Sequence, residues 1–178
     1  GPAHGQSEGK RTDIRDFEAV LKKLFEKVGA PDAILAHSFG GGVALYAAMN
    51  GLPVKKLINI ASPTIGDEII DNYLKAIGGS SKTKAFFKAY IQQKLGKPFD
   101  AFTALHFIQN LPRKIDLMLV HDENDREVSI RHPLALKEVY PSATVYRTSG
   151  LGHSRILKDD AVIQRCVTFI RSSSSLVG

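Results

Sequence analysis

ILAHSFGGGVALYAAM, residues 34–49, joins an apolar run to an alanine-rich run through a serine and three glycines. The segment 32–37 predicts a short buried strand, and the segment from Gly40 to Asn50 predicts a helix that ends before Gly51. Ser38 therefore lies in a sharp turn between strand and helix. Three roles suit a polar residue there: a plain turn, a phosphate-binding loop, or the presentation of a catalytic nucleophile.

The residues around Ser38 favour the nucleophile. A phosphate loop of the form G-x-x-x-x-G-K-[ST] is absent, because no lysine follows the glycines. A strained nucleophile turn needs small residues two positions before and two positions after the serine, and Ala36 and Gly40 meet that need. The usual first glycine of G-x-S-x-G is alanine here, and a methyl group is nearly as small. Gly41 and Gly42 are expected to let the helix approach the sheet closely.

Strands and helices alternate along the rest of the chain. Apolar segments predict three further strands, at 55–62, 116–122 and 143–149. Helical patterns occur between most of the strands, at 14–28 before the first strand, and at 161–171, where Cys166 is expected to be buried. This alternation predicts an α/β fold, a parallel sheet flanked by helices and built from right-handed crossovers.

A long insertion interrupts the alternation at 64–111. Three amphipathic helices are predicted in it, at 67–77, 84–96 and 100–111. The insertion is too long for a plain connection and is interpreted as a helical cap over the carboxyl edge of the sheet. The core domain then consists of residues 1–63 and 112–178. The alternative interpretation is that these helices belong to the main core.

A serine nucleophile needs a base that removes its proton and a carboxylate that orients the base. Asp125 follows the third predicted strand, and His153 follows the fourth. The carboxyl ends of parallel strands meet at one edge of a sheet, so both side chains are expected beside Ser38. Asp122 is the rival carboxylate and is expected to cap its own turn. His37 is expected to point away from the site if Ser38 points into it, and to be a structural group or one that supports the catalytic residues.

Together, these segments resemble the α/β-hydrolase superfamily. AHSFGG matches its nucleophile elbow, HDENDREV its acid loop and GLGH its histidine loop, in that order along the chain. PAHGQSEG, at the start of the sequence, resembles the loop after the fourth strand of that fold. The resemblance implies a catalytic triad of Ser38, His153 and Asp125, with the backbone N–H of Phe39 as an oxyanion donor. It implies no cofactor and no metal.

The resemblance also implies a missing part. A member of this superfamily normally has four strands before the loop that opens this chain, and the third of them leads to an oxyanion loop. The strand at 33–36, from Ala33 to Ala36, would then form an open apolar edge of the sheet, and such edges pair with other strands. We therefore expect that the chain is part of a longer protein or assembles through this edge.

The leading functional prediction is a serine hydrolase that cleaves a carboxylic ester or related acyl bond through an acyl-enzyme. The same triad also serves carbon–carbon bond hydrolases, thioesterases and perhydrolases. Outside enzymes, the alternative is a hydrolase-like binding module that does not turn over. A dehalogenase or an epoxide hydrolase would need aspartate in place of Ser38. Residues expected to shape a pocket for a small ester-like substrate are Phe86, Phe87, Tyr90, Phe99, Phe102 and His106.

Charge, hydropathy and cysteine content exclude several other classes of protein. The 178 residues carry a net charge of +6 that is spread without a basic run, so no nucleic-acid partner is expected. No apolar stretch approaches the roughly 18 residues of a membrane span. The single cysteine excludes an internal disulfide and fits a reducing compartment, so a cytoplasmic location is expected. Four residues with ligating side chains lack the compact spacing of a metal site: His121, Asp122, Asp125 and His132.

Overall fold

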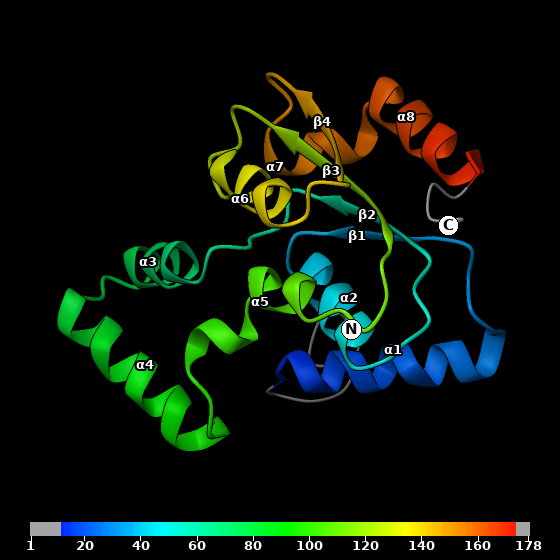
Figure 1. The fold of residues 1–178 in the computed structure, drawn as a ribbon. Coiled ribbons are helices and arrows are strands. Elements are labelled where there is room, and N and C mark those ends of the chain that lie inside the picture. The colour runs from blue at the N-terminus through cyan, green and yellow to red at the C-terminus, as the bar shows by residue number, and fades with distance from the viewer. Residues whose placement is uncertain (1–11, 174–178) are drawn as a thin grey trace.

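The centre of the molecule is a four-stranded sheet in a computed structural model that describes residues 12–173 (Figure 1). The segment PAHGQSEG lies outside these residues. The strands lie in chain order and are all parallel: β1 (Ile34–His37), β2 (Lys56–Ile60), β3 (Asp116–Asp122) and β4 (Thr144–Thr148). The predicted α/β class and the four predicted strands are confirmed.

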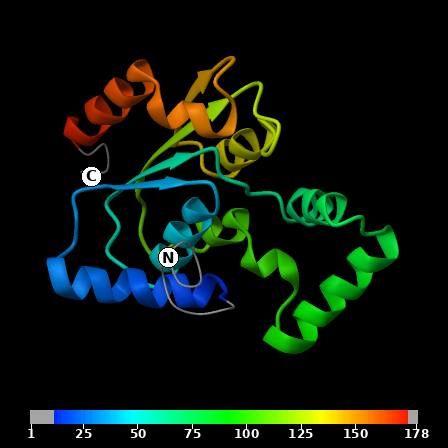
Figure 2. The same ribbon diagram turned by 180° about the vertical axis from the view of Figure 1, so that it is seen from behind.

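Helices cover both faces of this sheet (Figures 1 and 2). One face carries α1 (Ile14–Val28), α2 (Phe39–Met49), α5 (Ala104–Gln109) and α6 (Arg131–Val139). The other face carries α8 (Asp160–Arg171), which the chain reaches through the short α7 (Gly152–Arg155) and the 3-10 turn η2 (Ile156–Lys158). Within the described residues, no helix is both long enough and apolar enough to cross a membrane.

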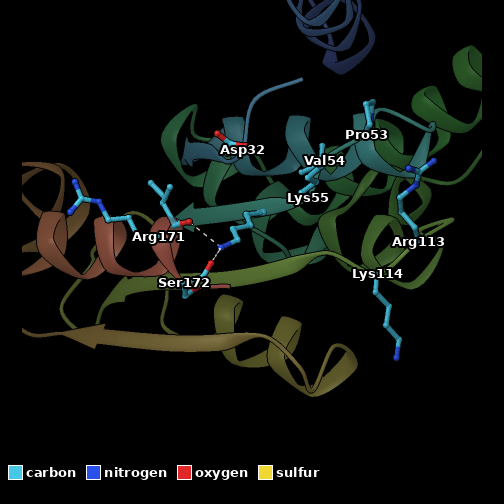
Figure 3. Close-up of a pocket in the computed structure, with 10 residues that line it drawn as sticks. Asp32, Pro53, Val54, Lys55, Arg113, Lys114, Arg171 and Ser172 are labelled. Carbon is cyan, nitrogen blue, oxygen red and sulfur yellow. Dashed lines mark hydrogen bonds between the residues drawn. The ribbon is translucent and has the colours of Figure 1, made fainter. Parts of the chain in front are cut away.

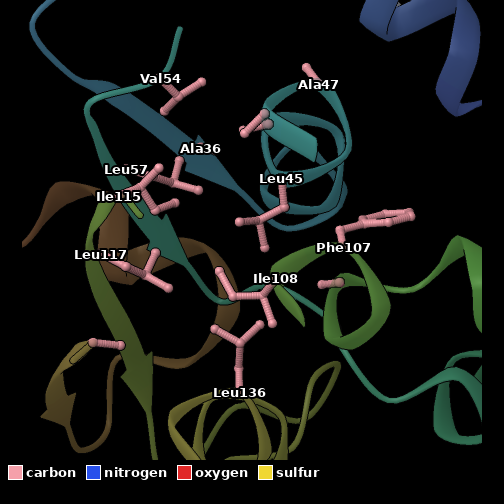
Figure 4. Packing of buried hydrophobic residues seen from close by; sticks show 14 of the residues in the cluster. Ala36, Leu45, Ala47, Val54, Leu57, Phe107, Ile108, Ile115, Leu117 and Leu136 are labelled. Carbon is pink, nitrogen blue, oxygen red and sulfur yellow. The ribbon is translucent and has the colours of Figure 1, made fainter. Parts of the chain in front are cut away.

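Alternate residues of the strands feed two hydrophobic cores, because successive side chains of a strand point to opposite faces. Leu57 and Leu117 pack towards α2 with Leu45, as Figure 4 shows. Ile58 and Met118 pack towards α8, where Cys166 is buried as predicted. Burial raises the pKa of the Cys166 thiol, so the thiol stays protonated.

The insertion divides into an outer and an inner part. Two helices, α3 (Gly66–Ala76) and α4 (Ser81–Leu95), project from the sheet as a pair (Figures 1 and 2). Ion pairs from Lys84 to Asp71 at 2.8 Å and from Lys88 to Asp67 at 2.5 Å join them.

The chain then passes through η1 (Phe99–Phe102) to α5, which returns to the body of the molecule. Phe107 and Ile108 of α5 are buried in the same core as α2. The assignment of all of 64–111 to a cap stays a prediction, with α3 and α4 lying outside the core and α5 inside it.

A lysine joins α8 to the amino end of β2. Lys56 is buried, and its Nζ donates to the carbonyl oxygens of Phe169 and Ile170 at 3.2 and 3.0 Å and also to that of Ser172. A cation at the carboxyl end of a helix satisfies the last carbonyls and interacts favourably with the helix dipole. The lysine lines a cavity of about 600 Å³ at the amino ends of β1, β2 and β3 (Figure 3).

Other cations surround this cavity without converging on it. Figure 3 shows Arg113, Lys114 and Arg171 extending in different directions. A site for an anion would direct several donors at one point. We therefore interpret the cavity as a structural groove between β2 and α8.

A buried histidine fixes the connection between β2 and α3. The backbone N–H groups of Thr64 and Ile65 donate to His132 Nδ1 at 2.8 and 3.0 Å. His132 Nε2 therefore carries the proton of the neutral ring and lies 3.4 Å from Glu68 Oε2. Burial, followed by the charges of His121 and Arg131, lowers the pKa of His132 to about 4. Protonation of Nδ1 would also break both backbone hydrogen bonds.

This pKa predicts acid sensitivity. The folded pKa lies below the unfolded value of about 6.5, so the unfolded state binds the proton more tightly. The stability is fully present above pH 6.5 and is lost as the pH falls towards the folded pKa. Between pH 7 and pH 5 we expect the loss to be about 2 kcal/mol.

Urea unfolding at several pH values measures this loss. His132→Asn is the comparison, because the amide oxygen of asparagine takes the position of Nδ1 and accepts the same two N–H groups. We expect the variant to be less stable at pH 7 and to lose about 2 kcal/mol less than the parent on acidification. Parallel pH profiles of the two proteins would contradict the assignment.

The first strand forms an edge of the sheet. Of the described strands, β1 pairs only with β2, and its other side is open. Leu35 of β1 is 52% exposed, although it lies in the strand that runs directly into Ser38. The open apolar edge predicted for residues 33–36 is present in the structure.

Candidate active site

Ser38 occupies a strained turn between β1 and α2. Its φ of 52° and ψ of −125° lie outside the regions that a residue with a side chain normally adopts. The backbone N–H of Ser38 donates to the carbonyl of Ile60 at 2.9 Å, which fixes the turn to the neighbouring strand. Strain of this kind costs about 1–3 kcal/mol and is concentrated at functional sites.

Small residues make the turn possible. A β-carbon placed on Gly40 would lie 3.8 Å from the β-carbon of Ala36, which is ordinary van der Waals contact. The methyl group of Ala36 therefore leaves room for the first turn of α2. The alanine that departs from the usual glycine is compatible with this geometry.

Gly41 and Gly42 differ in the structure. A β-carbon on Gly41 would lie 2.6 Å from Asn59 Cγ and closer still to Asn59 Oδ1 and Ser62 Oγ. A β-carbon on Gly42 would meet no atom within 4 Å. The prediction that both glycines permit close approach is correct for Gly41 and wrong for Gly42, because only the former faces β2.

Asp125 and His153 form a hydrogen-bonded pair. His153 Nδ1 donates to Asp125 Oδ2 at 2.8 Å, and the carboxylate is completely buried. The other carboxylate oxygen, Oδ1, accepts the backbone N–H groups of Glu127 and Val128 at 2.8 and 3.0 Å. These bonds fix the orientation of the carboxylate and leave Oδ2 for the histidine. This arrangement places the imidazole proton on Nδ1 and leaves Nε2 free to accept a proton.

A second buried histidine supports the acid loop. His121 Nε2 lies 2.8 Å from the carbonyl oxygen of Val128 and donates to it, because a carbonyl only accepts. Burial lowers the pKa of His121 and outweighs the opposing effects of Val128 and Asp125. The neutral ring thus closes the loop that carries Asp125, a role that the sequence analysis did not assign.

Asp122 organises the loop that carries His153. Its Oδ1 accepts the backbone N–H of Asn124, and its Oδ2 accepts from Thr148 Oγ1 and the backbone N–H of Leu151, all at 2.8–3.0 Å. The expected turn cap is therefore present, and the same carboxylate also holds the histidine loop. Burial alone would raise the pKa of Asp122, but these hydrogen bonds together lower it.

Ser38 and His153 are not hydrogen-bonded to each other. Within residues 12–173, no hydrogen bond joins Ser38 Oγ to His153. The free Nε2 lies 3.8 Å from Glu127 Oε2 on the exposed side. Catalytic hydrogen bonds are often long in the absence of substrate and tighten in the reacting complex.

A histidine next to Ser38 nevertheless contacts His153. His37 Nε2 lies 2.9 Å from the backbone carbonyl of His153, and the two ring centroids are 4.7 Å apart. His37 therefore supports His153 through its main chain, which is one of the two roles predicted for it. The contact also shows that the histidine loop meets the nucleophile turn directly.

An apolar cavity of about 540 Å³ adjoins the nucleophile turn. Phe39 and Gly42 of α2 form one wall, and α1, α3, α4 and η1 contribute the others. Five phenylalanines line it: Phe39, Phe87, Phe99, Phe102 and Phe107. The cavity therefore suits an apolar group.

The predicted pocket residues divide between this cavity and the surface. Phe87, Phe99 and Phe102 line the cavity. Phe86 is 75% exposed and Tyr90 is 53% exposed, and neither lines the cavity; the adjacent residues Phe86 and Phe87 point about 100° apart around α4.

His106 is half-buried on α5, where its ring packs edge-on against Phe107, and it does not line the cavity either. Phe107, which the sequence analysis did not select, is the α5 aromatic that lines it.

The backbone N–H of Phe39 follows Ser38 directly and begins α2. The first four N–H groups of a helix have no acceptor within the helix. The positive end of the α2 dipole lies at the same point. A developing negative charge beside Ser38 would be stabilised there.

Comparison with known proteins identifies related sequences and folds. The family model described as the alpha/beta hydrolase family matches residues 1–165. No curated protein matches the chain significantly.

Several solved structures share the fold. An esterase of Pyrococcus furiosus is 19% identical with a TM-score of 0.64, over 96% of this chain and 66% of its own. The esterase domain of a Rhodothermus marinus protein is 20% identical with a TM-score of 0.60, over 88% of this chain and 66% of its own. A meta-cleavage product hydrolase of Pseudomonas fluorescens is 15% identical with a TM-score of 0.61, over 93% and 74%. The chain thus spans just under two thirds of the first two structures.

Proposed function

Because the chain belongs to the alpha/beta hydrolase family, we propose that it is a serine hydrolase that cleaves carboxylic esters of apolar acids or alcohols. The observation that carries the proposal is the buried 2.8 Å hydrogen bond between Asp125 and His153, on a loop that contacts the strained turn of Ser38. The esterases among the similar folds support the same reaction class.

The proposed reaction follows from the orientation of these groups. Ser38 Oγ attacks the ester carbonyl while His153 Nε2 accepts its proton. Asp125 holds the other ring nitrogen in the protonated form and stabilises the imidazolium that results. His153 then gives the proton to the leaving alcohol, and an acyl-enzyme forms on Ser38. Water, activated by the same histidine, releases the acid.

Negative charge on the carbonyl oxygen needs hydrogen-bond donors during attack. We propose the backbone N–H of Phe39, at the start of α2, as one of these donors. A second donor would have to approach from the open side of β1, because that strand leads directly into Ser38. We propose that a further strand of the same protein covers this edge and brings such a donor.

The cavity defines the proposed substrate class. Its lining is mostly apolar, and the two charged residues in it, Asp13 and Arg15, pair with each other at 2.5 Å. Burying an apolar side group there is favourable by about 25 cal/mol per Å². We expect a medium-length acyl or alcohol chain to occupy it. The proposed reaction needs no cofactor or metal, and the proposed location is the cytoplasm.

Substitution of two neighbouring phenylalanines tests whether the cavity binds the acyl chain of the substrate. Phe87→Ala removes a ring that packs 5.7 Å from Phe99 in the lining, whereas Phe86→Ala removes an exposed ring. We expect Phe87→Ala to lower kcat/KM for p-nitrophenyl octanoate about 10-fold through lost apolar contact, with little change for the acetate. Phe86→Ala is the matched control. Equal losses on both esters would place the acyl chain elsewhere.

A fluorophosphonate probe tests the reaction class. It reacts covalently with an activated serine, so mass spectrometry should find one label on the peptide that contains Ser38, and Ser38→Ala should remove it. The experiment is run on this chain and on a longer product of the same gene where one exists. Labelling of either supports the hydrolase. Absence of labelling in both would overturn it in favour of a binding module.

A further inference from the structure

We propose that His37 is a positioning residue that holds the base His153 beside the nucleophile. The inference rests on the proposed function for its catalytic meaning, but the contact itself is independent of it. Residues 37 and 153 are far apart in the sequence, and the first of them is covalently bonded to Ser38. A hydrogen bond between His37 and the main chain of His153 therefore links the residue before Ser38 directly to His153.

The hydrogen bond defines the direction of the contact. The backbone oxygen of His153 only accepts, so the Nε2 of His37 must carry the proton and donate across 2.9 Å. His37 then has its acceptor nitrogen at Nδ1. Donation by His37 acts on the main chain of His153 and leaves its ring nitrogens free for Asp125 and Ser38.

The rings add a second contact. Their centroids lie 4.7 Å apart with an angle of 50° between the planes. A tilted aromatic pair at this separation is favourable and restricts the rotation of both rings. His37 therefore limits both the position of the His153 backbone and the direction of its imidazole.

The histidine loop needs such a restraint. Its helix, α7, has a single turn, and Gly150 and Gly152 before His153 have φ values of 84° and 68°. Residues at positive φ in a short turn are easily rearranged when they are glycine. Asn124 and Asp122 accept the backbone N–H groups of Gly150 and Leu151, whereas His37 donates to the main chain of His153 itself.

The edge of the sheet supplies the rigid end of this restraint. His37 is the last residue of β1 and lies opposite Ile60, whose carbonyl also holds the N–H of Ser38. A displacement of about 1 Å between reacting groups can cost about 100-fold in rate. A restraint between the strand end and His153 is therefore expected to affect the rate of attack more than the binding of substrate.

Three substitutions of His37 distinguish the effect of its hydrogen bond from the effect of its ring contact. In His37→Gln the amide nitrogen reaches the position of Nε2 and can still donate. In His37→Phe the ring remains and the donor is lost, and in His37→Asn the amide is too short to reach the carbonyl. Ser154→Ala, in the exposed part of the same turn, is the matched control.

The first readout is the rate at which fluorophosphonate labels Ser38. We expect His37→Phe and His37→Asn to slow labelling about 10–100-fold, and His37→Gln to stay within about threefold of the parent. For p-nitrophenyl esters the loss should appear in kcat, with KM nearly unchanged. Equal labelling rates in the parent, His37→Phe and His37→Asn would overturn the proposal.

The second readout does not depend on activity. The proton between His153 Nδ1 and Asp125 should give a downfield NMR signal, assigned by its loss in His153→Gln. We expect the signal to broaden through faster exchange in His37→Phe and His37→Asn and to persist in His37→Gln. An unchanged signal in all three variants would overturn the positioning role. Failure of the parent to label would instead contradict the proposed hydrolase, while the NMR comparison would still decide the role of His37.

Discussion

Asp125→Asn should reduce esterase turnover about 10⁴-fold while the protein stays folded. The reason lies in the two oxygens of the carboxylate. Oδ1 accepts two backbone N–H groups, from Glu127 and Val128, so the oxygen of the new amide must take that position. The amide nitrogen is then forced to face His153 Nδ1, where it donates. The ring must carry its proton on Nε2, and in that tautomer it cannot accept the proton of Ser38.

The measurement is the rate of ester hydrolysis together with the rate of fluorophosphonate labelling. Thermal unfolding should show a small change, because both backbone hydrogen bonds to position 125 survive. Glu123→Gln is a matched control, since it also converts a carboxylate to an amide in this loop and its ion pair with Arg147 is exposed. If the folded Asp125→Asn protein kept more than about a tenth of the parent rate, the assigned triad would be wrong.

Gly41→Ala should destabilise the fold by about 2–3 kcal/mol. The added methyl would overlap the side chains of Asn59 and Ser62, which are both buried. Alanine gains about 1 kcal/mol over glycine in a helix, which is too little to offset the overlap. The helix must therefore shift away from β2, and Ser38 shifts with it, so labelling should fall by about 100-fold.

Gly42→Ala is the control for stability. The new methyl meets no atom within 4 Å, so only the helix preference acts, and we expect a gain of up to about 1 kcal/mol. Urea unfolding of the two variants should thus differ by about 3 kcal/mol, although they differ by one position in the chain. Similar stabilities for the two variants would show that α2 does not rest on β2 through Gly41.

Much of the candidate site was predictable because local sequence fixes it. Small residues surround Ser38, as a nucleophile turn requires, and the pattern of strands and helices predicts parallel strands whose carboxyl ends share one edge. Asp125 and His153 follow two of those ends, and the structure brings them within a hydrogen bond. The pairing of these two side chains followed from topology without knowledge of any distance.

The supporting residues were not predictable in the same way. The group that His37 supports was not predictable: it contacts His153, because the loop after β4 reaches the end of β1. His121 and His132 look alike in the sequence, but the first closes the acid loop and the second holds the start of α3. Their roles depend on which backbone groups lie nearby, and a pattern of residue types does not contain that information.

The sequence by itself determined the α/β class, the order of the strands along the chain and the turn that presents Ser38. These features depend on hydrophobic periodicity and on residue size, which act over a few neighbouring positions. Only the tertiary structure decided which faces meet: Phe87 lines the cavity and Phe86 does not, and Gly41 touches β2 and Gly42 does not. Adjacent residues of a helix point about 100° apart, so the rotation of each helix against its neighbour makes that choice.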